Sequence, residues 1–170
     1  KEMNDEVEKF CFLADNVKKL PLAIENNLIG VSETLSTEFT EVRELFQKLE
    51  LNEGEMVVRF CRIRFFNEIP TIFETITLPL EHFPGFGTEV EPPNNLFRFY
   101  QSQYGVTVAK AAEHVRAIAA NTEEAILLGI EEGQPLLEID RVAKMLDGRP
   151  IEWRISHCDN TNYRYVMERG

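Results

Sequence analysis

Residues 135–158 read PLLEIDRVAKMLDGRPIEWRISHC, and this stretch decides the fold. On both sides of Asp147-Gly148, apolar and β-branched side chains alternate with polar ones, which is the pattern of a β-strand with one buried face. Asp-Gly between two such runs is a strong signal for a tight hairpin turn. We therefore predict strands over residues 135–146 and 149–158, joined by a two-residue turn.

A two-residue turn also predicts which side chains face each other across this hairpin. Glu152 would lie opposite Ala143, and Arg154 opposite Arg141. Two opposed guanidinium groups repel each other, so Glu152 or Asp159 must neutralise them. Glu152 is then either a structural ion-pair partner of Arg141 or a contact for a bound molecule.

The rest of the chain predicts further strands and a few short helices. Residues 55–66 and 69–78 are rich in Val, Ile, Phe and Thr, and they flank a turn at Asn67-Glu68. The other expected elements are an amphipathic helix over residues 1–20 that ends at Pro21, strands at 28–39, 106–118 and 163–168, a helix over 41–49 capped by Thr40, a helix capped by Asn94 or Asn95 that runs to Tyr104, and a helix from Thr122 to Gly129. Meandering strands with short helices between them predict an α+β fold, an antiparallel sheet with flanking helices.

Composition narrows the function. The chain has 170 residues, enough for one domain with its own core, and no apolar run approaches the length of a membrane span. Its net charge of −11 would repel nucleic acid, whose affinity for proteins comes largely from Lys and Arg. Cys11, Cys61 and Cys158 have no metal-type spacing and indicate reduced thiols in a cytosol. We expect no metal, cofactor or catalytic residue.

Two arginines on the strand at 55–66 are the first candidates for a binding site. Arg62 and Arg64 share one strand face with Phe60 and Phe66, because alternate residues point the same way. Adjacent guanidinium groups favour a bridging anion, and Arg is well suited to hold phosphate or carboxylate with two hydrogen bonds. The alternative is that both are surface arginines, or that they pair with carboxylates of this acidic chain.

Glu74 lies among apolar residues of the next strand, where a carboxylate needs a partner. That partner is either Arg62, in a structural salt bridge, or a hydroxyl of a ligand. The two side chains share a face only if the intervening turn has an odd number of residues. We expect an odd turn and a shared face.

The order of the motifs in the second half of the chain resembles the UTRA domain, the effector-binding half of HutC-type regulators in the GntR family. The resemblance covers residues 28 to 168. It is carried by Asn95-Leu96-Phe97, Tyr104-Gly105-Val106, Leu127-Leu128-Gly129-Ile130 with Gly133, the stretch Pro135 to Arg141, Asp147 to Glu152, and Asn162 to Tyr165. It implies the fold of chorismate lyase, with the ligand between the sheet and the surrounding loops.

The resemblance also implies roles for seven residues. Arg62 and Arg64 would bind the anionic group of the effector, with Glu74 and Glu152 on its polar groups. Asn95, Phe97 and Cys158 occupy pocket positions at which many relatives carry Ser, Tyr and an aromatic residue. The hydroxyl groups that hold phosphate in sugar-phosphate-sensing relatives are therefore missing, and we expect a smaller effector or a carboxylate.

For the whole protein, the resemblance implies a transcription regulator in the cytoplasm. The chain starts at Lys1, so we expect residues 1–27 to be a linker or helix that follows a missing winged-helix domain, and residues 28–170 to be the UTRA domain. The expected partners are a small anionic metabolite, a second copy of the chain, and DNA through the missing domain alone, with no membrane. The alternative is an enzyme of the chorismate lyase type that acts on a small aromatic acid.

Overall fold

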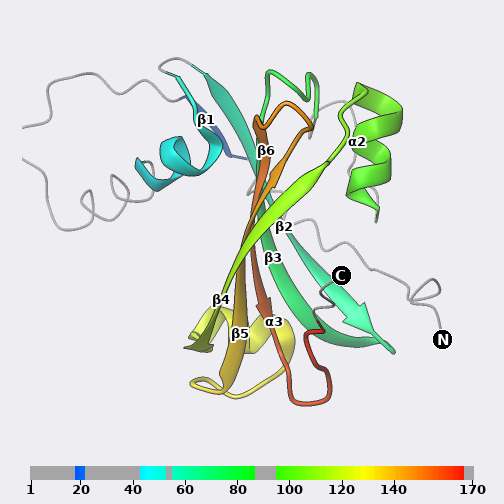
Figure 1. Cartoon of the computed structure of the whole chain (residues 1–170). Helices are drawn as coiled ribbons and strands as arrows, with labels where there is room; N and C mark the ends of the chain where they lie inside the picture. Colours follow the sequence, from blue (N-terminus) through cyan, green and yellow to red (C-terminus); the bar gives the residue numbers. More distant parts are fainter. Residues whose placement is uncertain (1–17, 22–42, 53–54, 87–94, 167–170) are drawn as a thin grey trace, which may run out of the picture.

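The computed structural model describes residues 18–21, 43–52, 55–86 and 95–166. A strongly twisted antiparallel sheet of six strands, in the order β1-β2-β3-β6-β5-β4, forms its centre (Figure 1). The strands are β1 (Lys18–Pro21), β2 (Met56–Phe66), β3 (Ile69–Pro79), β4 (Lys110–Ala119), β5 (Pro135–Lys144) and β6 (Pro150–Cys158). The predicted α+β class with an antiparallel sheet is confirmed.

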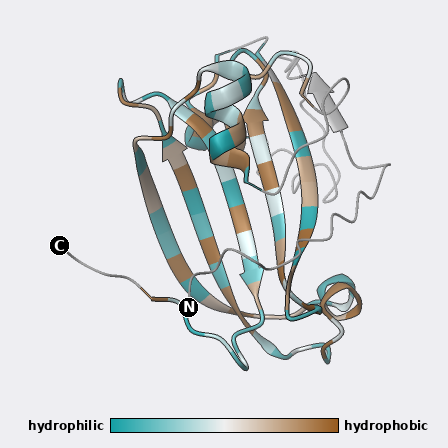
Figure 2. Ribbon diagram, turned by 90° about the vertical axis from the view of Figure 1, so that its right-hand side faces the viewer, coloured by the Kyte–Doolittle hydropathy of each residue, from teal (hydrophilic) through white to brown (hydrophobic). Residues whose placement is uncertain are grey.

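Helices cover the two faces of the sheet unequally (Figure 1). Helix α2 (Leu96–Tyr104) packs on one face, which we call the α2 face, with Phe83, Phe86 and Tyr100 in its main apolar cluster. The opposite face, the α3 face, carries α3 (Thr122–Leu128) and the helical residues 43–49. Hydrophobic and hydrophilic residues alternate along the strands (Figure 2), so neighbouring residues of a strand present apolar and polar side chains to opposite faces of the sheet.

A β-bulge sets the pairing of β2 with β3. The turn Asn67-Glu68 has two residues, and both adopt positive φ angles, 49° and 65°, as in a hairpin turn of type I′. Pairing shifts by one residue between Arg64 and Phe65, which leaves Thr71 without an opposite residue. The expected odd turn is therefore wrong, yet Arg62 does lie opposite Glu74, because the extra residue of the bulge corrects the register.

The hairpin of β5 and β6 also contains a β-bulge. Met145 N donates to Arg149 O at 2.9 Å, so the loop spans residues 146–148 and is longer by one residue than the predicted two-residue turn. A second register shift leaves Ile151 without an opposite residue. The predicted pairs, Glu152 with Ala143 and Arg154 with Arg141, are confirmed.

Some predicted elements differ in the structure. Residues Lys18–Pro21 form a strand against β2, so the predicted helix over 1–20 is wrong at its end, where backbone pairing overrides the amphipathic pattern. Residues 163–166, the described part of the strand predicted over 163–168, are not in a strand, because they pair with none of the six strands of the described sheet. The predicted strand at 106–118 begins only at Lys110. The rest of the N-terminal helix and the strand at 28–39 lie outside the described residues.

Candidate functional site

A cavity of about 500 Å³ opens on the α2 face, in the part of the sheet that α2 leaves uncovered. Alternation along four neighbouring strands brings its floor together, and the segment after β6 forms a wall. The lining residues are Arg64, Phe66, Thr71, Ile72, Glu74, Glu113, Leu137, Ile139, Arg141, Arg154, Ser156, Cys158, Asp159, Asn160, Tyr163, Arg164 and Tyr165. The volume suits a small organic ligand.

Two arginines and two glutamates form a buried ionic cluster at one side of this cavity. The Nε of Arg62 donates to Glu74, and both side chains are at most 4% exposed. Arg154 donates from Nη2 to Glu152 Oε2 at 2.9 Å, and its Nη1 lies 3.5 Å from Glu74 Oε1. Ser156 donates to Glu74 at 3.2 Å. The four charges compensate one another, as burial of charge demands.

Two members of the cluster, Glu74 and Arg154, keep their charge despite burial. Burial opposes ionisation of Glu74, but Arg154, Arg62 and Arg64 outweigh it and hold the pKa of this carboxyl below its usual value. Burial likewise disfavours the charged form of Arg154, and the carboxylates of Glu152 and Glu74 reverse that effect and raise its pKa. The site therefore presents fixed charges that need no proton exchange with water.

Tyr100 connects the ionic cluster to α2. Its hydroxyl donates to Glu152 Oε2 at 2.7 Å, and the Glu152 side chain is 0% exposed. Burial, reinforced by the negative charge of Glu152, raises the pKa of Tyr100 well above its usual value, so the phenol stays protonated and remains a donor. A movement of the Glu152 side chain would therefore act directly on α2 through this hydrogen bond.

Phe97 and two arginines separate the cavity from a second hollow. The guanidinium carbons of Arg141 and Arg154 lie 4.8 and 5.6 Å from the centre of the Phe97 ring, within the range of a cation–π contact. The second hollow, also about 500 Å³, lies between α2 and the start of β4, and its lining includes Phe97, Arg98, Lys110 and Arg141. Arg141 therefore borders both spaces.

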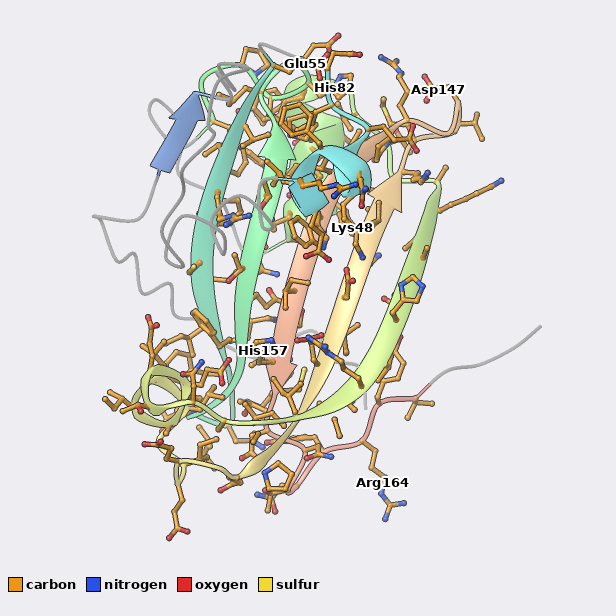
Figure 3. The ribbon with its side chains drawn as sticks, turned by 90° about the vertical axis from the view of Figure 1, so that its left-hand side faces the viewer. Lys48, Glu55, His82, Asp147, His157 and Arg164 are labelled. Atoms are coloured by element: carbon orange, nitrogen blue, oxygen red, sulfur yellow. The ribbon has the colours of Figure 1, made fainter. Side chains whose placement is uncertain are left out.

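The segment that follows β6 returns over the sheet. The ring of Tyr163 lies 5.1 Å from that of Phe66, between ring centres, and the hydroxyl of Tyr165 donates to Glu113. Asp159 N donates to Thr71 O at 2.9 Å, which fixes the segment where it leaves the sheet. Arg164 extends from it at the lower end of the molecule (Figure 3).

Three of the seven predicted site residues line the cavity: Arg64, Glu74 and Cys158. Arg62 and Glu152 are buried in the ionic cluster beside Glu74, so the structural salt bridge foreseen for Arg62 and Glu74 exists. Phe97 borders the second hollow. Asn95 is exposed and caps α2, accepting a hydrogen bond from Arg98 N at 3.1 Å. Ligand binding by these seven residues remains a prediction.

The sequence did not predict that Arg154 joins the ionic cluster. The residue was expected to face Arg141, which it does, but its contacts with Glu74 and Glu152 were not foreseen. The available signal was that Arg154 and Glu152 alternate on the same strand face. Ser156 is the next residue on that face, and the same alternation could have identified it.

Polar contacts on the α3 face tie the covering helices to the sheet. Lys48, labelled in Figure 3, pairs with Asp140, which also accepts from Trp153 Nε1 at 2.9 Å. Farther along the sheet His157 lies between two carboxylates, those of Glu124 and Glu138. These contacts hold the helices in place and border no cavity described above.

Within the described ranges, no group of three or more His, Cys, Asp and Glu side chains is arranged to hold a metal ion. None of the helices in that part of the chain is long and apolar enough to cross a membrane.

Comparisons with known proteins agree on one family. A family model described as the UTRA domain matches residues 31–164. The transcriptional repressor NagR of Bacillus subtilis is 24% identical over 165 residues, which cover 97% of this chain and 65% of NagR. NagR and the other curated relatives matched here, among them YurK of Bacillus subtilis, have names of transcription regulators or repressors. The chain spans less than two thirds of the length of each of these relatives.

Solved structures show the same fold. The ligand-binding domain of a GntR-family regulator from Bordetella bronchiseptica is 36% identical, with a TM-score of 0.66 over 74% of this chain and 82% of that chain. PhnF from Mycobacterium smegmatis, at 20% identity, superposes with a TM-score of 0.69 over 83% of this chain and 70% of its own.

Proposed function

The chain belongs to the UTRA domain family, and from this premise we propose that its α2-face cavity binds a small anionic effector. The observation that carries the proposal is the charge of the lining. Four arginines, Arg64, Arg141, Arg154 and Arg164, surround a space of about 500 Å³ in a chain whose net charge is −11. Against them the lining has three carboxylates, those of Glu74, Glu113 and Asp159, so the cavity is not negative although the protein is acidic. This local charge balance favours an anion over a cation.

We propose that binding is reported to a DNA-binding domain of the same regulator. In this proposal a winged-helix domain precedes the UTRA domain of residues 28–170, and the connection lies within residues 1–27, of which β1 (Lys18–Pro21) already pairs with the sheet. The protein would then be a cytoplasmic regulator of the HutC type. The relatives support this, because they are regulators that extend beyond the matched region. Their names favour a regulator over the alternative of a chorismate lyase-like enzyme.

We propose further that the domain forms homodimers through β4. This strand is at the edge of the sheet and pairs only with β5 among the described residues. Val115 is 44% exposed, and Ala111, Ala117 and Ala119 on the same face are exposed as well. A long, exposed edge with small apolar side chains is open to pairing with another strand.

The dimer has a direct test. Light scattering should give a mass near twice 19.6 kDa at micromolar concentration. Val115→Lys, which puts a charge in the middle of the edge, should lower it to that of one chain. A single-chain mass for the unaltered protein would contradict the dimer without affecting the proposal for the cavity.

The cavity proposal is tested by a thermal-shift screen of anionic metabolites. A ligand at about 100 times its dissociation constant stabilises the folded state by about 2.7 kcal/mol. Any hit should lose at least about tenfold in affinity in Arg64→Gln, since a charge-assisted contact is worth on the order of 1.5–3 kcal/mol. Arg149→Gln is the matched control, because Arg149 is exposed and pairs with Asp147 outside the cavity. Equal affinity in Arg64→Gln and the unaltered chain would contradict the proposal.

A further inference from the structure

The floor of the cavity is largely apolar, although arginines surround it. Ile72, Cys158 and Leu137 lie side by side on β3, β6 and β5, and Ile139 is the next residue of β5 on the same face. The rings of Phe66 and Tyr163 form a wall of the same cavity. Cys158 adds to the apolar surface, because a neutral thiol behaves as a small hydrophobic group. These side chains offer apolar contact to the body of a ligand.

Most polar groups of the lining are already used within the protein. Ser156 donates to Glu74, which also accepts from Arg62. Glu113 accepts from Tyr165. A ligand with many hydroxyl groups needs a partner for each one that it buries. The engaged state of these side chains therefore disfavours a sugar.

The guanidinium group of Arg141 is only weakly compensated by carboxylates. Arg154, directly opposite on β6, contacts two glutamates. Arg141 has Glu113 at 3.6 Å from its Nε, too far for a good hydrogen bond, and that Nε has no hydrogen-bond partner among the described residues. With the positive charge of Arg154 facing it across the strands, an additional anion would be stabilised at Arg141.

We infer that the effector is a small carboxylate with an apolar, ring-bearing body, held at its carboxylate by Arg141 and along its body by Leu137, Ile139 and Tyr163. The inference rests on the proposed function, since it names the chemical class that the same cavity would take. A carboxylate matches the planar fork of a guanidinium group. The body needs only the apolar contact that the floor provides.

The test uses isothermal titration calorimetry with the 170-residue chain. The probes are three ring-bearing carboxylates (phenylacetate, 3-phenylpropionate and indole-3-propionate), the neutral analogue indole-3-propionamide, and glucose 6-phosphate. We expect at least one of the carboxylates to bind, and the amide and the sugar phosphate to bind at least about tenfold more weakly, as loss of a charge-assisted contact predicts.

Two variants locate the carboxylate. Arg141→Gln should weaken the binding carboxylate at least about tenfold, whereas Arg141→Lys, which keeps the charge and loses the fork, should weaken it less. Arg149 is exposed and lies next to the hairpin loop of residues 146–148. Its substitution Arg149→Gln should leave affinity unchanged. Leu137→Asn should weaken the carboxylate by removing apolar contact while leaving the charges in place.

The outcomes separate the inference from the proposed function. Glucose 6-phosphate binding in preference to all three carboxylates would overturn the inference and keep the anionic effector. Equal binding of acid and amide, or unchanged affinity in both Arg141 variants, would overturn the role of Arg141. If none of the carboxylates binds, the inference fails, and the thermal-shift screen of anionic metabolites then decides the proposed function separately.

Discussion

Arg154 and Glu152 lie two residues apart on one face of β6, and Arg154 Nη2 donates to Glu152 Oε2 at 2.9 Å. The same guanidinium group contacts Glu74 and borders the cavity, so one side chain belongs both to the buried ionic cluster and to the candidate site. Substitutions in this cluster will therefore change stability as well as binding, and the two effects must be measured separately.

Replacing Arg62 with Met should destabilise the fold. Glu74 would lose an arginine partner while staying buried, and breaking a buried ion pair from one side costs about 3–5 kcal/mol. Urea denaturation should show a loss at the lower end of that range, because Arg154 and Ser156 remain near Glu74. Arg149→Met, at an exposed position, should change the free energy of unfolding by less than about 0.5 kcal/mol. An unchanged midpoint for Arg62→Met would show that Glu74 does not depend on this pair.

Replacing Tyr100 with Phe tests the connection between α2 and the ionic cluster. The fully buried Glu152 would lose the donor at 2.7 Å, and its Oε1 already lacks a hydrogen-bond partner among the described residues. We expect a loss of about 1.5–3 kcal/mol in the free energy of unfolding. Tyr165→Phe is the control, since its hydroxyl bonds to Glu113 at the surface and should matter less. Equal effects of the two substitutions would contradict the special position of Tyr100.

The stability of the domain should fall in acid partly because of Glu74. Its pKa is lower in the folded protein than its usual value of 4.5, so its ionised form stabilises the fold above that value. This contribution is lost as the pH falls below about 4.5 and through the folded-state pKa. Glu74→Gln should therefore show a shallower loss of unfolding free energy with acid than the unaltered chain. Glu131→Gln, an exposed substitution, should keep the steeper slope, and identical slopes for all three proteins would exclude a contribution from Glu74.

The thiol of Cys158 should react slowly. Burial, together with the negative charge of Glu74, raises the pKa of Cys158 to about 12, which leaves little of the reactive thiolate near pH 8.5. In a Cys11→Ser, Cys61→Ser background, alkylation by iodoacetamide should be at least about a hundredfold slower in the native protein than in urea. Comparable rates in the two states would show that the thiol is exposed and ionised.

The strands could be predicted because local composition and periodicity agree with the final sheet. The runs around Asn67-Glu68 and Asp147-Gly148 are rich in β-branched and aromatic residues, and both form the expected hairpins. The loop lengths could not be predicted, because a bulge at Thr71 or Ile151 depends on how a strand fits its neighbours rather than on the turn.

The candidate site was only partly predictable. Arg64 reaches the cavity by strand alternation, Glu74 reaches it because the bulge at Thr71 corrects the register, and Cys158, placed by resemblance, lines it as well. Phe97 and Asn95 were placed by resemblance, and the packing of α2 puts the first beside another hollow and the second at the surface. The C-terminal wall with Tyr163 could not be foreseen, since the segment was expected to form a strand.

The two bulges have a practical consequence for protein engineering. Because the register correction lies inside the strands, the loop at residues 146–148 does not by itself determine which side chains face the cavity. Leu146 is 86% exposed at the tip of that loop. A fluorophore attached there would leave Arg141, Arg154 and their neighbours in place, and its emission could follow occupancy of the cavity from a distance. The domain is thus suited to become an optical biosensor labelled at a hairpin tip.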